Sequence, residues 1–219
     1  MTFPTIFDWL ERFAWLRGFP AAYVVLLAAF IIVVVGDWRV AIFALALQYL
    51  VSGLLFVDVL DPRLAIVKVL TGLFICLMLY WTARQVKLGG RPAAPNNNRY
   101  LSIGPIQAPL AILWRLASAA LMAWLVWTLA QRPEYQAPFV PAHVNLAIYA
   151  LAGLGLLGLS WTAHPFWAGL GLLTALVGGE LLYSAVEQSV ATLVLLAAVD
   201  LLVTLVIAYL TQAHHVIIT

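Results

Sequence analysis

Five ionisable side chains lie within or at the edge of long apolar segments, where they can take part in proton chemistry. They are two cations and three acids: Lys68, Arg115, Glu180, Glu187 and Asp200. A charged carboxylate at the centre of a bilayer costs about 3 kcal/mol on insertion scales, so it usually faces a partner or a water-filled path. Acidic side chains are too short to reach the interface as lysine and arginine do. We therefore expect Glu180 and Asp200 to face the protein interior.

Depth within the apolar segments restricts which of these residues can pair. Lys68 lies about 8 Å into its segment and Arg115 about 12 Å into its own, at 1.5 Å per helical residue. Glu180 is expected in the same half of the membrane as Lys68, and Asp200 near the midplane with Arg115. Glu187 follows Glu180 by seven residues on the same helical face, but its position at a turn predicts contact with water.

Two interpretations of these charges remain open from the sequence. In the first, they are static ion pairs that fix helix packing; removing one partner of such a pair is costly even where the pair itself adds little stability. In the second, Glu180, Lys68 and Asp200 are steps on a hydrated proton path, because acid–base relays in membranes use such residues. Their distribution over several helices favours the second interpretation.

Other motifs do not indicate catalysis, a cofactor or a metal site. The GxGxxG spacing of residues 153–158 lies inside an apolar segment, where small residues let helices approach closely, whereas a dinucleotide site needs a preceding strand. Cys76 is the only cysteine, and no GxSxG, HExxH or Walker sequence is present. No histidine lies deep enough in a span for bis-histidine haem ligation: His143, His164, His214 and His215. We therefore expect a protein that is not itself an enzyme.

Composition places the chain among membrane proteins. Of its 219 residues, 65% are hydrophobic and only 9% are charged, whereas soluble domains have about 25% charged residues. The apolar segments are long enough for transmembrane helices, which need about 20 residues each. The sequence predicts an all-α polytopic protein, and the lack of a basic stripe argues against nucleic-acid binding.

The pattern predicts about seven transmembrane helices in a single domain, residues 1–219, preceded by a short interfacial helix at 1–19. That first segment could alternatively be a docking arm for a partner subunit. The turn at 187–189 contains no Gly or Pro, so one bent helix there would reduce the count to six. Three spans are expected within 20–84, a basic loop at 85–106, the fourth span at 107–131, and three more spans within 143–213. The expected spans, in chain order, are 20–36, 40–57, 63–81, 107–131, 144–160, 165–186 and 189–211.

The loop at 85–106 predicts the orientation. Its glycines, prolines and three consecutive asparagines are typical of a loop without stable structure. Lys87, Arg91 and Arg99 within it, and Arg84 just before it, are accompanied by no acid. Basic loops favour the cytoplasmic side. We expect a multi-pass protein of the cell (inner or plasma) membrane, with the N-terminus outside and this loop and the C-terminus cytoplasmic.

Two stretches resemble a known family. IVKVLTGLFICLMLYWTARQ, with Lys68 early and Arg84 near the end, is similar to a helix of the hydrogenase-4 component E family. GGELLYSAVEQSVATLVLLAAVDLLVTLVIAYL, with Glu180 before a short turn and Asp200 in mid-helix, resembles that family's terminal helix pair. The family is related to subunit K of respiratory complex I and to the small C subunit of Mrp-type antiporters.

The resemblance implies a non-catalytic membrane subunit of a proton- or sodium-translocating complex, in some cases redox-driven. Its partners would be membrane lipids and large antiporter-like subunits. Glu180 would be the protonatable centre, Lys68 its modulator, and Asp200 a second relay or an anchor. Two alternatives stay open: a self-standing small transporter, although no internal repeat of the kind usual in that class is evident, and a structural anchor or assembly subunit.

Overall fold

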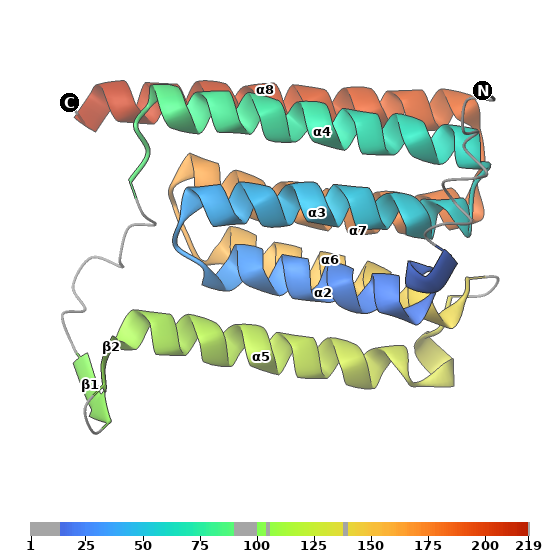
Figure 1. The fold of residues 1–219 in the computed structure, drawn as a ribbon, viewed down its shortest axis with the longest axis horizontal. Helices are drawn as coiled ribbons and strands as arrows, with labels where there is room; N and C mark the ends of the chain where they lie inside the picture. Colours follow the sequence, from blue (N-terminus) through green and yellow to red (C-terminus); the bar gives the residue numbers. More distant parts are fainter. Residues whose placement is uncertain (1–13, 90–99, 104–105, 138–139, 219) are drawn as a thin grey trace, which may run out of the picture.

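A computed structural model describes residues 14–89, 100–103, 106–137 and 140–218. These residues form a bundle of long, nearly parallel α-helices (Figure 1). The helices are α2 (Phe19–Val34), α3 (Trp38–Val57), α4 (Pro62–Gln85), α5 (Leu110–Ala130), α6 (Ala142–Ser160), α7 (Pro165–Val186) and α8 (Val190–Ile218). Two 3-10 helices, η1 (Ala14–Leu16) and η2 (Pro133–Tyr135), and a hairpin of β1 (Tyr100–Ile103) and β2 (Ile106–Pro109) complete the described elements.

Six of these helices are long and apolar enough to cross a membrane. The expected polytopic, helical membrane fold is thus confirmed, with one helix for each expected span. The exception in length is α2, whose 16 residues correspond to about 24 Å, somewhat short of a hydrocarbon core of about 30 Å. It nevertheless lies side by side with the longer helices (Figure 1).

The bundle consists of two rows of three helices. One row contains α2, α3 and α4, the other contains α6, α7 and α8, and α5 packs at the α2–α6 edge (Figure 1). Each helix of the first row runs in the same direction as the helix that faces it in the second row: α2 with α6, α3 with α7, and α4 with α8. At one end, the rings of Phe19 and His143 are 5.9 Å apart, and at the other, Gln212 Nε2 donates to Gln85 Oε1 at 3.1 Å. The topology is therefore not that of an inverted repeat.

Glycines allow the backbones of α6 and α7 to approach each other closely. A Cβ atom on Gly155 would lie 2.4 Å from the backbone nitrogen of Ala175, and one on Gly171 would lie 2.4 Å from that of Leu159. Gly155 belongs to the GxGxxG segment. The segment therefore serves helix packing, in line with the interpretation from the sequence.

Helix ends follow local capping rules. The carboxylates of Asp37 and Asp61 accept hydrogen bonds from the backbone N–H groups of Arg39 and Arg63, each at 2.9 Å. Side-chain acceptors at this position satisfy N–H groups that the helix leaves unpaired.

The chain makes a true turn between the last two helices. Helix α7 ends at Val186, Glu187 is extended with φ −134° and ψ 120°, and α8 begins at Val190. The two helices then pack against each other. The alternative of one bent helix across residues 187–189 is wrong.

The basic loop differs from its predicted form. Helix α4 continues to Gln85, and residues 100–103 pair with 106–109 in an antiparallel hairpin. Gln107 therefore lies in β2, and α5 begins at Leu110 rather than at 107. The prediction weighed the glycines, prolines and asparagines, but Tyr, Leu and Ile flanking a Gly-Pro dipeptide form a recognisable hairpin signal.

Two further boundaries differ from the sequence prediction. Helix α8 runs to Ile218 instead of ending near 211, so His214 and His215 are helical. Of the expected interfacial helix at 1–19, residues 1–13 lie outside the described residues. Ala14–Leu16 is a single 3-10 turn, and α2 already begins at Phe19.

Candidate functional site

Lys68, Glu180 and Asp200 meet inside the bundle, where α4, α7 and α8 come together. Lys68 Nζ pairs directly with Glu180 Oε1 and lies 3.8 Å from Asp200 Oδ2. None of the three residues is more than 3% exposed. We call this group the Lys68 triad. It is a buried ion cluster with one cation and two acids.

Helical periodicity places each member of the triad on the buried stripe of its own helix. Buried residues recur every three to four positions, as on one face of an α-helix. The stripes are Ala65, Lys68, Gly72 and Ile75 on α4; Val177, Glu180, Leu181 and Ser184 on α7; and Ala197, Asp200, Thr204 and Ile207 on α8. The other residues of these stripes are mostly apolar, so the three charges depend chiefly on one another.

The triad lies nearer one end of the bundle. We call this end, which holds the turns at 58–61 and 187–189, the Asp58 end; the opposite end, which holds the turns at 35–37, 86–89 and 161–164, is the Arg84 end. Lys68 follows Pro62 by six residues and Glu180 precedes Val186 by six, so each lies about 9 Å from its helix end. The shared depth predicted for Lys68 and Glu180 is what allows them to pair. Asp200 lies ten residues into α8, or about 15 Å.

Tyr49 of α3 forms a fourth side of the site. Its side chain is buried, and its hydroxyl has no hydrogen-bond partner among the described residues. The ring lies directly on Gly72, one turn after Lys68: a Cβ there would be 2.2 Å from Tyr49 Cγ. Tyr49 is also near enough to Asp200 and Glu180 for their charges to act on it. Sequence reasoning missed Tyr49, because a tyrosine in an apolar helix gives no signal by itself.

Several buried polar atoms around the triad lack a partner in the described part of the chain. These atoms are Glu180 Oε2, Tyr49 Oη and Ser184 Oγ. Buried polar groups in folded proteins are nearly always hydrogen-bonded, either to protein or to internal water. Their clustering on α3 and α7 marks the polar side of the Lys68 triad.

Polar side chains extend from the triad toward both ends of the bundle. Towards the Arg84 end, the buried hydroxyls of Thr204 and Thr211 each donate to the carbonyl four residues earlier, both at 2.7 Å, which leaves their oxygen lone pairs available as acceptors. Towards the Asp58 end, Ser184 lies one turn beyond Glu180. Glu187 follows at the exposed turn, where Tyr183 donates to its carboxylate at 2.5 Å.

Arg115 is not part of the site. It is buried on α5, which packs against α6 and α2 at the opposite edge of the bundle from α8 (Figure 1). The predicted pairing of Arg115 with Asp200 is therefore wrong. Arg115 follows the start of α5 at Leu110 by five residues, about 8 Å from the Arg84 end, and depth in any case does not determine which helices are neighbours. Glu187 is exposed at its turn, as expected.

A second ion cluster, missed in the sequence, joins three segments at the Asp58 end. Asp58 caps the end of α3, and its two carboxylate oxygens contact Arg17 Nη2 at 2.5 Å and His143 Nε2 at 2.9 Å. Arg17 precedes α2, and His143 lies in the first turn of α6. These side chains are partly exposed, so the cluster ties loops together rather than forming a buried centre.

At the Arg84 end, His164 caps α7 and its ring contacts the tilted ring of His214 on α8. His164 Nδ1 accepts from the backbone N–H of Phe166 at 3.3 Å, and the two imidazole centroids are 5.0 Å apart. Burial, and secondarily the charge of His214, lowers the pKa of His164 below its usual value. No cluster of three or more His, Cys, Asp or Glu residues suited to a metal is found among the described residues.

A scan against protein-family models, a search of curated proteins and a search of solved structures each return no match for this chain. The functional conclusion rests on the membrane-spanning bundle and on the chemistry of the Lys68 triad within it.

Proposed function

We propose that this protein is a non-catalytic membrane subunit of a proton- or sodium-translocating complex, in which the Lys68 triad binds and releases the ion. The observation that carries the proposal is the sharing of one buried ammonium group by two buried carboxylates. A purely structural ion pair needs one acid for one base. The second acid makes the cluster a site for an additional cation.

Charge balance explains why the second carboxylate matters. With all three groups ionised, the triad carries a net charge of −1, and an uncompensated buried charge costs several kcal/mol. Binding of one proton by either carboxylate makes the cluster neutral. A sodium ion could compensate the same charge, so the experiment below measures both ions.

The polar atoms around the triad supply a route to and from it. Ser184 and Glu187 lead towards the Asp58 end, and Thr204 and Thr211 lead towards the Arg84 end. Tyr49 Oη and Glu180 Oε2 lie between these branches with unused hydrogen-bonding capacity. Proton relays within membranes are built from such side chains and internal water.

The exposure of the outer helices supports membership of a larger complex. In the spans of α4 and α8, which supply Lys68 and Asp200, only 33% and 28% of residues are buried, compared with 61% for α3. The triad therefore lies directly behind the broad apolar face that α4 and α8 form at the edge of the bundle. The resemblance of α4, α7 and α8 to helices of the hydrogenase-4 component E family suggests an antiporter-like subunit as the partner on that face.

The distribution of charged residues supports the proposed orientation. Among the described residues, Arg39, Arg84 and Lys87 lie at the Arg84 end, where Asp37 is the acid. The Asp58 end contains as many described basic residues, Arg17, Arg63 and Arg132, so the excess of cations at the Arg84 end comes from Arg91 and Arg99 in the segment that joins α4 to α5. By the positive-inside rule, we place the Arg84 end on the cytoplasmic side of the cell membrane.

The test is ion uptake by membrane vesicles that contain the assembled complex. E180Q removes the protonatable carboxylate but keeps its shape and hydrogen-bonding capacity. We expect E180Q to reduce proton or sodium uptake strongly while the amount of assembled complex stays unchanged. E134Q, which changes an exposed acid in η2 outside the helices of the triad, is the control and should retain uptake. Normal uptake in assembled E180Q would refute the proposal.

A charge exchange separates this proposal from a structural anchor. In K68E/E180K the ion pair can form in reverse, but the protonatable group moves to another helix. An anchor that needs only the pair would function normally, whereas an ion-binding centre would not. Transport by the isolated chain in liposomes would instead indicate a self-standing transporter, although the same-direction rows lack the inverted repeat common in that class.

A further inference from the structure

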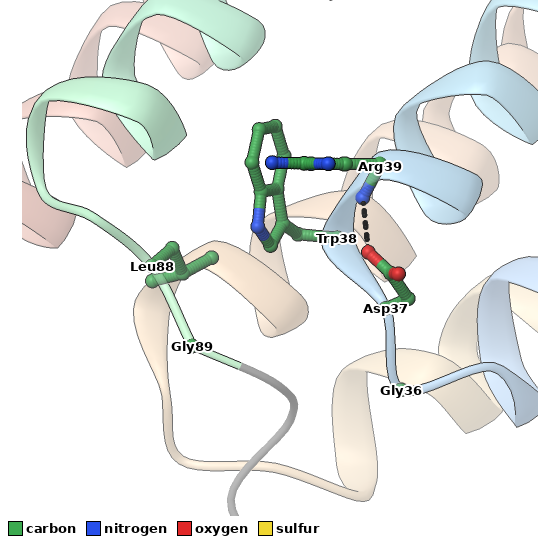
Figure 2. A pocket seen from close by; sticks show the side chains of 6 residues that line it. All are labelled: Gly36, Asp37, Trp38, Arg39, Leu88 and Gly89. Carbon is green, nitrogen blue, oxygen red and sulfur yellow. Dashed lines mark hydrogen bonds between the residues drawn. The ribbon is translucent and has the colours of Figure 1, made fainter.

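A cationic pocket lies at the Arg84 end, between the start of α3 and the end of α4. It has a volume of about 410 Å³ and is lined by Trp38, Arg39, Tyr80 and Arg84. An adjoining hollow of about 430 Å³ is shared by the 36–39 turn and by Leu88 and Gly89, which follow α4. Figure 2 shows the Arg39 guanidinium reaching across the Trp38 ring, with Leu88 facing both side chains.

Both arginines in this pocket have unused binding capacity. Neither Arg39 nor Arg84 forms an ion pair with an acid within the described part of the chain. The nearby Asp37 carboxylate accepts the backbone N–H of Arg39 as the cap of α3 (Figure 2). Each guanidinium has five N–H donors. Two such groups in one pocket favour an anion with several oxygens, above all a phosphate.

Aromatic rings place the pocket at the membrane interface. Trp38 and Tyr80 have ring centroids 5.8 Å apart, and the Arg39 guanidinium lies 5.3 Å from the centre of the Trp38 ring. Tryptophan and tyrosine concentrate at the level of lipid headgroups. The pocket is therefore at a height where a lipid phosphate, rather than only a solute, has access to it.

Apolar stripes continue from each arginine towards the membrane interior. Phe43, four residues after Arg39, is 71% exposed, and Leu77, seven residues before Arg84, is 53% exposed. These spacings put each apolar residue on the same helical face as its arginine. Leu50 on α3 and Leu73 on α4 extend the two exposed stripes.

We propose that this pocket binds an anionic phospholipid. Arg39 and Arg84 hold the phosphate, Trp38 and Tyr80 flank the glycerol region, and the acyl chains lie along the stripes that begin at Phe43 and Leu77. Basic pockets between transmembrane helices commonly bind anionic headgroups. A free phosphate would use the cations but would leave the apolar stripes unused.

The experiment measures lipid binding to the purified full-length protein by native mass spectrometry and by thermal unfolding in detergent. Phosphatidylglycerol, phosphatidylcholine and inorganic phosphate are added separately. We expect phosphatidylglycerol to bind wild type and raise its unfolding temperature more than the other two. R39Q/R84Q should bind phosphatidylglycerol about thirtyfold more weakly, given about one kcal/mol for each basic residue near an anionic lipid. R63Q/R132Q, which changes two exposed arginines at the Asp58 end, should bind it like wild type.

Three results would overturn the proposal. Equal effects of phosphatidylglycerol and phosphatidylcholine on wild type would show that the charge is not recognised. An equal effect of inorganic phosphate would identify a soluble anion as the ligand. Unchanged phosphatidylglycerol binding by R39Q/R84Q would place the lipid elsewhere. If the double variant does not fold, the single variants R39Q and R84Q must each weaken phosphatidylglycerol binding. None of these outcomes depends on ion translocation, so this proposal and the proposed function stand or fall separately.

Discussion

Lys68 on α4 pairs with Glu180 on α7, 112 residues further along the chain, and both side chains are almost completely inaccessible. The pair joins α4, at the end of the first row, to α7 in the second row. Asp200 joins it from α8, so a single ammonium group connects three helices.

Replacing Lys68 by methionine should destabilise the protein strongly. The variant keeps the volume of the side chain but leaves Glu180 and Asp200 without their cation. Removal of one partner from a buried ion pair costs about 3–5 kcal/mol. Thermal unfolding in detergent, followed by tryptophan fluorescence, measures the effect. R63M, which changes an exposed cation on the same helix, is the control; equal unfolding temperatures for K68M and R63M would contradict a buried pair.

Tyr49→Phe should separate stability from ion movement. The Tyr49 hydroxyl has no hydrogen-bond partner among the described residues, so its loss should change the free energy of unfolding by less than about 1 kcal/mol. If the hydroxyl is part of the ion path, uptake by vesicles with the assembled complex should nevertheless slow. Y209F alters an exposed tyrosine on α8 and should change neither quantity. Full uptake in Y49F would exclude Tyr49 from the path.

Gly171→Ala should disrupt the contact between α6 and α7. The added Cβ would lie 2.4 Å from the backbone nitrogen of Leu159, and backbone cannot move aside as a side-chain tip can. Overpacking of this kind costs about 1–3 kcal/mol. Gly179, on the same helix, has nothing within 4 Å of the corresponding Cβ position. G179A should therefore be neutral or slightly stabilising, and a similar loss in both variants would contradict the packing.

The His164 cap should make stability depend on pH. Because burial and His214 lower the pKa of His164 in the folded protein, the unfolded chain takes up the proton first as the pH falls. Stability should therefore decrease as the pH drops below about 6.5, the ordinary histidine value. H164N keeps an acceptor at the cap but cannot titrate. Its unfolding temperature should fall less than that of wild type between pH 7 and pH 5; identical profiles would contradict the assignment.

Hydrophobic patterning was sufficient to predict the membrane fold, because each span is a long apolar run ended by charges, Gly or Pro. It also placed Lys68 and Glu180 at one depth, since depth follows directly from the number of residues to the end of a helix. The pairing of Asp200 with Lys68 instead of Arg115 depends on which helices are neighbours. That is decided by contacts such as Gly155 with α7, which the apolar pattern does not encode.

The same limitation applies to Tyr49 and Asp58. Tyr49 reaches the triad only because Gly72 leaves room for its ring, a relation between two helices that neither sequence segment reveals. Asp58 looks like a simple helix-end acid until Arg17 and His143 are brought to it by the fold. The hairpin at 100–109 is a different case, because its β-forming residues and turn dipeptide were present in the sequence but were outweighed by the adjoining asparagine-rich loop.

Infrared difference spectroscopy of the purified protein across a pH titration can detect a proton on the Lys68 triad. A neutral triad contains one protonated carboxyl group, whose C=O band should disappear when the proton leaves. This band should be lost or displaced in E180Q and D200N and unchanged in E187Q. If wild type shows no protonated-carboxyl band that these two substitutions alter, the triad is a permanently ionised packing cluster and does not carry a proton.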